Sequence, residues 1–370
     1  MEKAKISVIQ LFSLLFLFEM GSALVVSYGI NAKKDAWLAI LLAMCGGIIL
    51  SFIYYFLFRQ YPNLPLTGYA RKILGKYVGW IVGLLYVVFF LYGASRNVRD
   101  FGDLLLSSTM SETPLLALNI LFVLAICYVL YLGIEVLGRT AEVFIVILIL
   151  FGIVGNFFVY LSGNVDLNNL KPFLENGWKP ILMTVPITTF FPFGEIVAFT
   201  MLLPYLNRHE LVKKVWLSSV ISSGLILSYT TSLDIAVLGV EATERATFPL
   251  LSTIGKVNLF EFIQRLDALV VFSFLITMFF KTSIFLYSTV IGIVDLFKLK
   301  NHQQIIFPIG LILIFLSMTN ASDFSEHVEE GLEIIMYPLY IPLFVIIPLF
   351  MLLVAMIRNG FKKKNRNNET

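Results

Sequence analysis

The sequence predicts an all-α integral membrane protein, a single transmembrane domain over residues 1–370. Composition is the first observation: 58% of the residues are hydrophobic and only 14% are charged, against about 45–50% and about 25% in soluble domains. The second is that the hydrophobic residues form runs long enough to cross about 30 Å of hydrocarbon. The third is that no connection between these runs is long enough to hold a soluble domain. The lipid bilayer is therefore the expected surroundings of the chain.

Ten hydrophobic runs have the length of a membrane-spanning helix. They cover residues 6–29, 36–58, 78–106, 115–134, 140–162, 181–206, 214–238, 266–293, 304–320 and 334–357. Between the second and third runs, Pro62 and Pro65 interrupt the chain. The segment that follows, "LTGYARKILGKYVG", predicts a short amphipathic helix at the membrane surface.

The distribution of Lys and Arg predicts the orientation of these spans. With the N-terminus in the cytoplasm, seventeen Lys and Arg residues fall in cytoplasmic segments and seven in outer segments, as the positive-inside rule requires. Both termini are then cytoplasmic. Residues 359–370, which end in "KKKNRNNET", are expected to form a disordered cytoplasmic tail, and the acidic string "DFSEHVEEGLE" at 323–333 is expected outside.

The ten spans divide into two halves of five around the long outer segment 162–180. A repeat with an odd number of spans must be inverted relative to its copy, as in many secondary transporters. We therefore expect inverted repeats over 6–163 and 178–358. Their first helices read "LFLFEMGSALVV" and "TTFFPFGEIVAF", and each places a glycine beside an acidic or polar residue. Glu19 and Glu195 both lie about 20 Å into their spans.

The segment "PFGE" at 192–195 predicts a break in the sixth span. Proline removes an amide donor and glycine permits non-helical angles, so the chain is expected to unwind near Gly194 and, in the first span, near Gly21. Unwound backbone at this depth must line a cavity or pack against protein. We interpret the paired breaks as the wall of a small-molecule site. The alternative is a proline kink in which Glu195 bonds to a neighbouring helix.

Lys281 lies at mid-depth in the eighth span, where an unpaired charge costs several kcal/mol. Glu195 and Glu19 are the mid-depth carboxylates available to it. The pair could shape or gate the site, or it could be a structural ion pair, and these roles are compatible. Near the outer end of the third span, the i, i+4 spacing of Arg96 with Asp100, and of Arg99 with Asp103, predicts a charge ladder.

Nothing in the sequence favours catalysis. His209, His302 and His327 are far apart in loops, and no phosphate loop, zinc-ligand spacing or nucleophile elbow is present. The net charge of +3 is too small to indicate binding of nucleic acid. We expect neither an enzyme nor a bound cofactor or metal.

Four segments in order resemble a known family over nearly the whole chain. They are "FEMGSALVV" at 18–26, "FRQYPNLPLTGYARKILGKYVG" at 58–79, "PFGE" at 192–195 and "RLDAL" at 265–269. The chain resembles the B subunit of endospore germinant receptors, spore germination proteins of the amino acid–polyamine–organocation superfamily. The resemblance implies a LeuT-type fold of ten helices in a five-plus-five inverted repeat with helices 1 and 6 broken.

The resemblance also implies a function, partners and a site. It implies a sensor of a nutrient, an amino acid or a sugar, in the spore inner membrane, acting with receptor A and C subunits. The family site lies where helices one, three, six and eight meet. Carried onto this chain, the site residues are Gly21, Ser22, Ala23, Tyr92, Phe193, Gly194, Glu195 and Phe272. Gly21 is followed by Ser22 rather than by a second glycine, which leaves the class of ligand open.

The sequence leaves two functions open. The first is a sensing subunit that keeps a transporter fold but moves little or no substrate and signals to its partners. The alternative is a proton- or sodium-coupled amino-acid permease, in which Glu195 or Glu19 would carry the proton. Both functions use the same fold and pocket.

Overall fold

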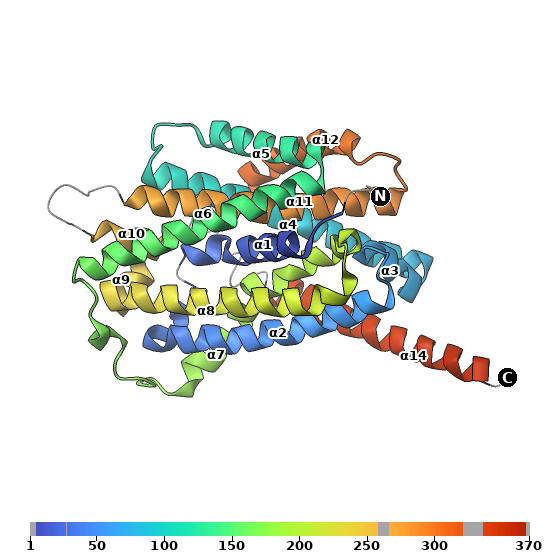
Figure 1. The fold of residues 1–370 in the computed structure, drawn as a ribbon, viewed down its shortest axis with the longest axis horizontal. Coiled ribbons are helices and arrows are strands. Elements are labelled where there is room, and N and C mark those ends of the chain that lie inside the picture. Colours follow the sequence, from blue (N-terminus) through green and yellow to red (C-terminus); the bar gives the residue numbers. More distant parts are fainter. Residues whose placement is uncertain (1–4, 27, 258–265, 321–335, 368–370) are drawn as a thin grey trace.

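A computed structural model describes residues 5–26, 28–257, 266–320 and 336–367, with the side chains of 336, 337 and 359–367 left aside. Within this part the chain is a bundle of helices that run roughly along one axis (Figure 1). The start of the described chain, α3 and the end of α14 lie toward one end of the bundle. The short helices α9 and α10 lie toward the other (Figure 1).

Each of the ten predicted spans has a helical counterpart. The first five are α1 (Val8–Met20) with η1 (Ser22–Leu24), α2 (Ala36–Gln60), α4 (Lys76–Ser108), α5 (Leu115–Leu132) and α6 (Ile134–Leu161). The second five are α7 (Trp178–Thr188) with η4 (Thr189–Gly194) and η5 (Glu195–Met201), α8 (Val212–Leu238), α11 (Asp267–Phe297), α12 (Gln303–Thr319), and η9 (Met336–Ile346) with α14 (Ile347–Asn367). Among the described residues, eight helices are long and apolar enough to cross a membrane, while α1 and α12 are shorter apolar helices.

The connections carry shorter helices. They are η2 (Ile30–Asp35), α3 (Leu66–Leu74), η3 (Leu167–Leu170), η6 (Leu203–Tyr205), η7 (His209–Leu211), α9 (Val240–Arg245) and α10 (Pro249–Gly255). Helix α3 confirms the predicted amphipathic helix. One expectation about the end of the chain is wrong: α14 continues to Asn367, so a helix occupies most of the segment 359–370 that the sequence suggested was disordered. The acidic string at 323–333 lies outside the described residues.

The eighth span, α11, is the central helix of the bundle. In its apolar window 78% of the residues are buried, against 22% for α6, so α11 is surrounded by protein whereas α6 faces outward. Helix α11 packs along α4 and also contacts α1, α6 and η5. A polar side chain on α11 must therefore find its partner within the protein.

The first span breaks at Gly21. This residue has φ 34° and ψ −138°, a positive-φ conformation outside the helical regions that glycine adopts more readily than any other residue. Helix α1 ends there, and the chain resumes as the short 3₁₀ turn η1. The predicted break in the first helix is confirmed at the expected residue.

The sixth span is also broken, but three residues earlier than the sequence suggested. Phe191 has the extended angles φ −115° and ψ 117°, whereas Gly194 is helical at φ −71° and ψ −32°. The residue before a proline is disfavoured in the helical region because of the proline ring, so Pro192 places the break at Phe191. Gly194 serves a different purpose. A Cβ atom there would lie 2.5 Å from the ring of Phe344, so its missing side chain lets the tenth span approach closely.

Helix α2 supports the broken sixth span through two adjacent glycines. A Cβ on Gly46 would lie 2.7 Å from the Thr189 side chain, and one on Gly47 would lie 2.6 Å from Cβ of Phe193. Both contacts are with η4. These glycines allow the irregular segment to lie directly on the α2 backbone, which is how unwound backbone is tolerated at membrane depth.

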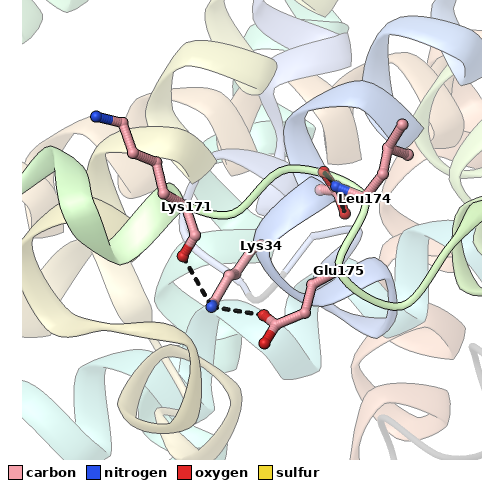
Figure 2. Close-up of polar contacts among 5 residues, drawn as sticks. Lys34, Lys171, Leu174 and Glu175 are labelled. Carbon is pink, nitrogen blue, oxygen red and sulfur yellow. Dashed lines mark hydrogen bonds and ion pairs between the residues drawn. The ribbon is translucent and has the colours of Figure 1, made fainter.

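Polar contacts hold the ends of the bundle. At one end, Lys34 Nζ lies 2.8 Å from the carbonyl oxygen of Lys171 and 2.6 Å from Glu175, and the Leu174 amide donates to the buried Asp35 carboxylate (Figure 2). These contacts fix the long connection 162–180 beside the start of α2. At the other end, Arg71 of α3 pairs with Asp295 of α11 at 2.7 Å.

Candidate functional site

The side chain of Lys281 on α11 touches both broken spans. It is 0% exposed. A Cβ atom added to Gly21 would lie 2.5 Å from its Cδ, so the aliphatic chain of Lys281 packs directly on the first break. Its Nζ lies 2.6 Å from Glu195 Oε2, at the start of η5 just after the second break.

Aromatic rings cover the rest of the ammonium group. Lys281 Nζ lies 4.3 Å from the ring centroid of Phe191 and 5.6 Å from that of Phe18. A cation over an aromatic face gains electrostatic stabilisation, more so when it is desolvated. The residue at the second break is therefore itself a wall of the lysine site, which the sequence reasoning did not identify.

The partner of Lys281 is Glu195 rather than Glu19, which decides the alternative that the sequence left open. The Glu195 side chain is 8% exposed. Desolvating two charges in this way can cost as much as their attraction returns, so the pair is weak evidence for stability. Its position between two helix breaks fits either a structural or a gating role.

Hydroxyl groups on α11 donate to backbone carbonyls of both broken spans. Thr277 Oγ1 donates to the Gly21 carbonyl oxygen at 3.1 Å, and Ser288 Oγ donates to that of Ala198 at 3.1 Å. Thr277 precedes Lys281 by one turn of α11, so both side chains share a face. The i, i+4 spacing of two polar residues in an apolar helix was the signal in the sequence that could have identified Thr277.

The predicted ligand residues are only partly brought together. Gly21 and Glu195 both contact Lys281, and Ser22 and Ala23 follow in η1, each 3% exposed. Phe193, which is fully buried, packs instead against Gly47 of α2. Gly194 faces Phe344 and not the lysine.

Tyr92 and Phe272 make no direct contact with Lys281 among the interactions of the described residues, and their surroundings differ. The Tyr92 hydroxyl accepts from Arg96 Nη1 at 3.1 Å, within the polar residues of α4. In the same region Arg99 and Asp103 pair at 2.8 Å, as the ladder predicted. Phe272 is 54% exposed, so it is not packed with the residues around Lys281, and its assignment to the site stays a prediction. It precedes Lys281 by nine residues, and at about 100° per residue this places it on the opposite face of α11.

Glu19 occupies a separate place on the other side of α1. It is 0% exposed, and its Oε2 accepts from Ser219 Oγ of α8 at 2.9 Å. The two mid-depth glutamates, which looked equivalent in the sequence, therefore have different surroundings: Glu195 faces a cation and Glu19 faces hydroxyl groups.

Comparison with protein families shows which family the chain belongs to. The family described as "Spore germination protein" matches residues 5–325. The chain belongs to this family. It is 40% identical to Spore germination protein KB of Bacillus subtilis (strain 168) over 370 residues, which cover 100% of this chain and 99% of the relative. It is 26% identical to Spore germination protein A2 of the same organism over 335 residues, covering 86% and 84%. The resemblance noted from the four sequence segments is confirmed.

Solved structures show the fold. The crystal structure of MhsT in complex with L-phenylalanine superposes with a TM-score of 0.71 at 14% identity, covering 94% of this chain and 89% of MhsT. Mhp1, a nucleobase-cation-symport-1 family transporter in a closed conformation with bromovinylhydantoin bound, gives 0.68 at 14% identity, covering 92% and 78%. The expected LeuT-type architecture is confirmed, while the bounds 6–163 and 178–358 of its repeats remain predictions.

The ion pair makes a prediction about stability. Replacing Lys281 alone (Lys281→Met) leaves Glu195 buried without a counter-charge and should lower the free energy of unfolding by about 3–5 kcal/mol. Adding Glu195→Gln should recover part of that loss, whereas adding Glu19→Gln should recover none. Unfolding of the purified chain by SDS titration in mixed micelles measures all three. Equal recovery by both glutamine variants would mean that the pairing is wrong.

Proposed function

We propose that the chain is the nutrient-sensing membrane subunit of a spore germinant receptor. Its ligand, an amino acid or a sugar, would bind at mid-membrane where the broken first and sixth spans meet α11. The observation that carries this proposal is the position of Lys281, which packs on Gly21 and pairs with Glu195. A buried charge held between two helix breaks is the kind of feature that marks a ligand site in membrane proteins.

The same geometry supports a mechanism for sensing. In this conformation most residues around both breaks are buried, while Phe191 and Leu24 are partly buried, so a ligand would have to separate them. A ligand that binds the separated state better than the packed state shifts the population toward it. The cost of the shift is the loss of the contacts that α11 makes with the two breaks. The resulting movement of the first and sixth spans would be the signal.

The signal requires a recipient. Membership of the spore germination protein family supports a complex with receptor A and C subunits in the spore inner membrane. The charge bias along the sequence supports cytoplasmic termini, and Arg71, Lys298 and Lys300 would then lie at the cytoplasmic end with α3.

The alternative function is a proton- or sodium-coupled amino-acid permease. A specific observation favours keeping it: the solved structures with this fold include MhsT, bound to L-phenylalanine, and Mhp1, a nucleobase–cation symporter. Both glutamates remain candidates for proton transfer in that case. Transport and sensing would use the same breaks and differ in whether the ligand crosses the membrane.

Transport by the isolated chain separates the two functions. We expect liposomes that contain only this purified chain to accumulate no labelled amino acid above protein-free liposomes, with either a proton or a sodium gradient imposed. Saturable accumulation driven by one of these gradients would contradict the sensor and establish the permease.

Sensing itself can be tested at Thr277. Thr277→Val keeps the shape of the side chain but removes a hydroxyl that lies 3.1 Å both from the Gly21 carbonyl oxygen and from the Phe274 carbonyl oxygen of its own helix. The bond within α11 is available in either state, whereas the bond to Gly21 needs the packed state, so the packed state should lose about 1 kcal/mol relative to the separated state. Germination should then reach its half-maximum at a nutrient concentration roughly fivefold lower. Thr289→Val is the matched control, because the buried Thr289 hydroxyl bonds only within α11, to the Phe285 carbonyl. At equal protein levels in the spore membrane, an unchanged midpoint for Thr277→Val would refute the mechanism.

A further inference from the structure

Glu19 is a buried acid that the proposed sensing mechanism does not use. It is the second-last residue of α1, two residues before the break at Gly21, and it is 0% exposed. Its Oε2 accepts from Ser219 Oγ at 2.9 Å. Ser223, one turn further along α8 and equally buried, has its hydroxyl group close to the same carboxyl group. Within the described residues, Glu19 Oε1 and Ser223 Oγ make no hydrogen bond of normal geometry.

No described cation balances a charge on Glu19. On α11, Lys281 pairs with Glu195 of η5 and lies over the ring of Phe18, whose side chain points about 100° away from that of Glu19. On α6, Glu142 approaches Ser7 at the far end of α1, about 18 Å along the helix.

The remaining charged and titratable groups near α1 also lie elsewhere. On α8 itself, Lys213 and Lys214 are exposed near its start, with Lys213 over the ring of Phe52, and Asp234 accepts from Thr253 near its other end. The Tyr28 hydroxyl donates to the Thr188 carbonyl. The surroundings of Glu19 are therefore hydroxyl groups and apolar side chains.

We propose that Glu19 is a proton-binding site, whose carboxyl group holds a proton while α1 packs against α8. An ionised carboxylate with no counter-charge is too costly at such a site, and the group neutralises instead. A proton on Glu19 Oε1 would give a hydrogen bond to both atoms that otherwise lack one, Glu19 Oε1 and Ser223 Oγ. Ser219 already donates to Oε2, and a protonated Oε1 donates to Ser223 Oγ.

A metal ion explains the site less well. Glu19, Ser219 and Ser223 supply four side-chain oxygens in total, whereas hard cations such as Ca²⁺ take about six to eight oxygen ligands. A proton needs only the one acceptor that the structure supplies. This assignment is independent of the proposed sensing function, because neither Lys281 nor Glu195 takes part in it.

Because Glu19 lies close to the break in the first span, proton binding depends on the conformation of that span. Gly21, two residues later, is the point at which α1 can pivot. Separation of α1 from α8 admits water to Glu19, and the hydrated carboxyl group releases its proton. Because the packed state binds the proton and the separated state releases it, acid stabilises the packed state and alkaline pH favours separation.

Infrared spectroscopy of the purified full chain in lipid at neutral pH tests the proposal. The difference spectrum between the native protein and Glu19→Gln should show the loss of a carbonyl-stretch band from a protonated carboxylic acid. Glu195→Gln is the control, because Glu195 faces Lys281 and should lose carboxylate bands instead. Loss of carboxylate bands in Glu19→Gln would overturn the proposal.

Two further measurements keep the test decisive if Glu19→Gln folds poorly. Ser223→Ala, which leaves Glu19 in place, should shift the same acid band to higher frequency because the proton loses its acceptor; an unshifted band would refute the assignment. The melting temperature of the native protein should also fall between neutral and alkaline pH. Where Glu19→Gln can be purified, that fall should be lost, and a fall of the same size would contradict the proposal.

Discussion

The ammonium group of Lys281 is fully buried near the centre of the bundle, and the arrangement around it follows from the need to balance its charge. Glu195 supplies the opposite charge at 2.6 Å, and the rings of Phe191 and Phe18 cover the remaining surface. Glu195 can reach the lysine because the sixth span is broken just before it. The aliphatic part of the lysine fits because Gly21 has no side chain. One charge thus links α11 to two irregular helices.

The two mid-depth glutamates show how surroundings assign different roles to one residue type. Glu195 has a cation within contact distance, which favours its ionised form, whereas Glu19 has serine hydroxyl groups and no described counter-charge. Moving α1 away from its neighbours would disturb both groups, since Gly21 contacts Lys281 and Glu19 lies two residues earlier. The first span therefore connects the lysine site on one side with the acid site on the other.

The sequence was sufficient to predict the spans and the existence of both breaks, because apolar run length, proline and glycine act locally. It could not choose between Glu19 and Glu195 as the partner of Lys281, since that depends on which faces of three helices meet. Gly194 was misread for the same reason: its small size serves packing against Phe344, a contact between residues 150 positions apart. Helical periodicity alone could have shown that Phe272 lies on the face of α11 opposite Lys281. The helix that continues to Asn367 was missed because its polar residues gave no apolar signal.

The central claim is that Lys281 holds both breaks at once, and hydrogen–deuterium exchange measures this directly. In the purified chain carrying Lys281→Ala, we expect faster exchange in peptides covering 15–26 and 186–199 together. A peptide from α5 should exchange at the native rate, which would exclude general unfolding. Faster exchange at the second break alone, or at neither break, would contradict the account.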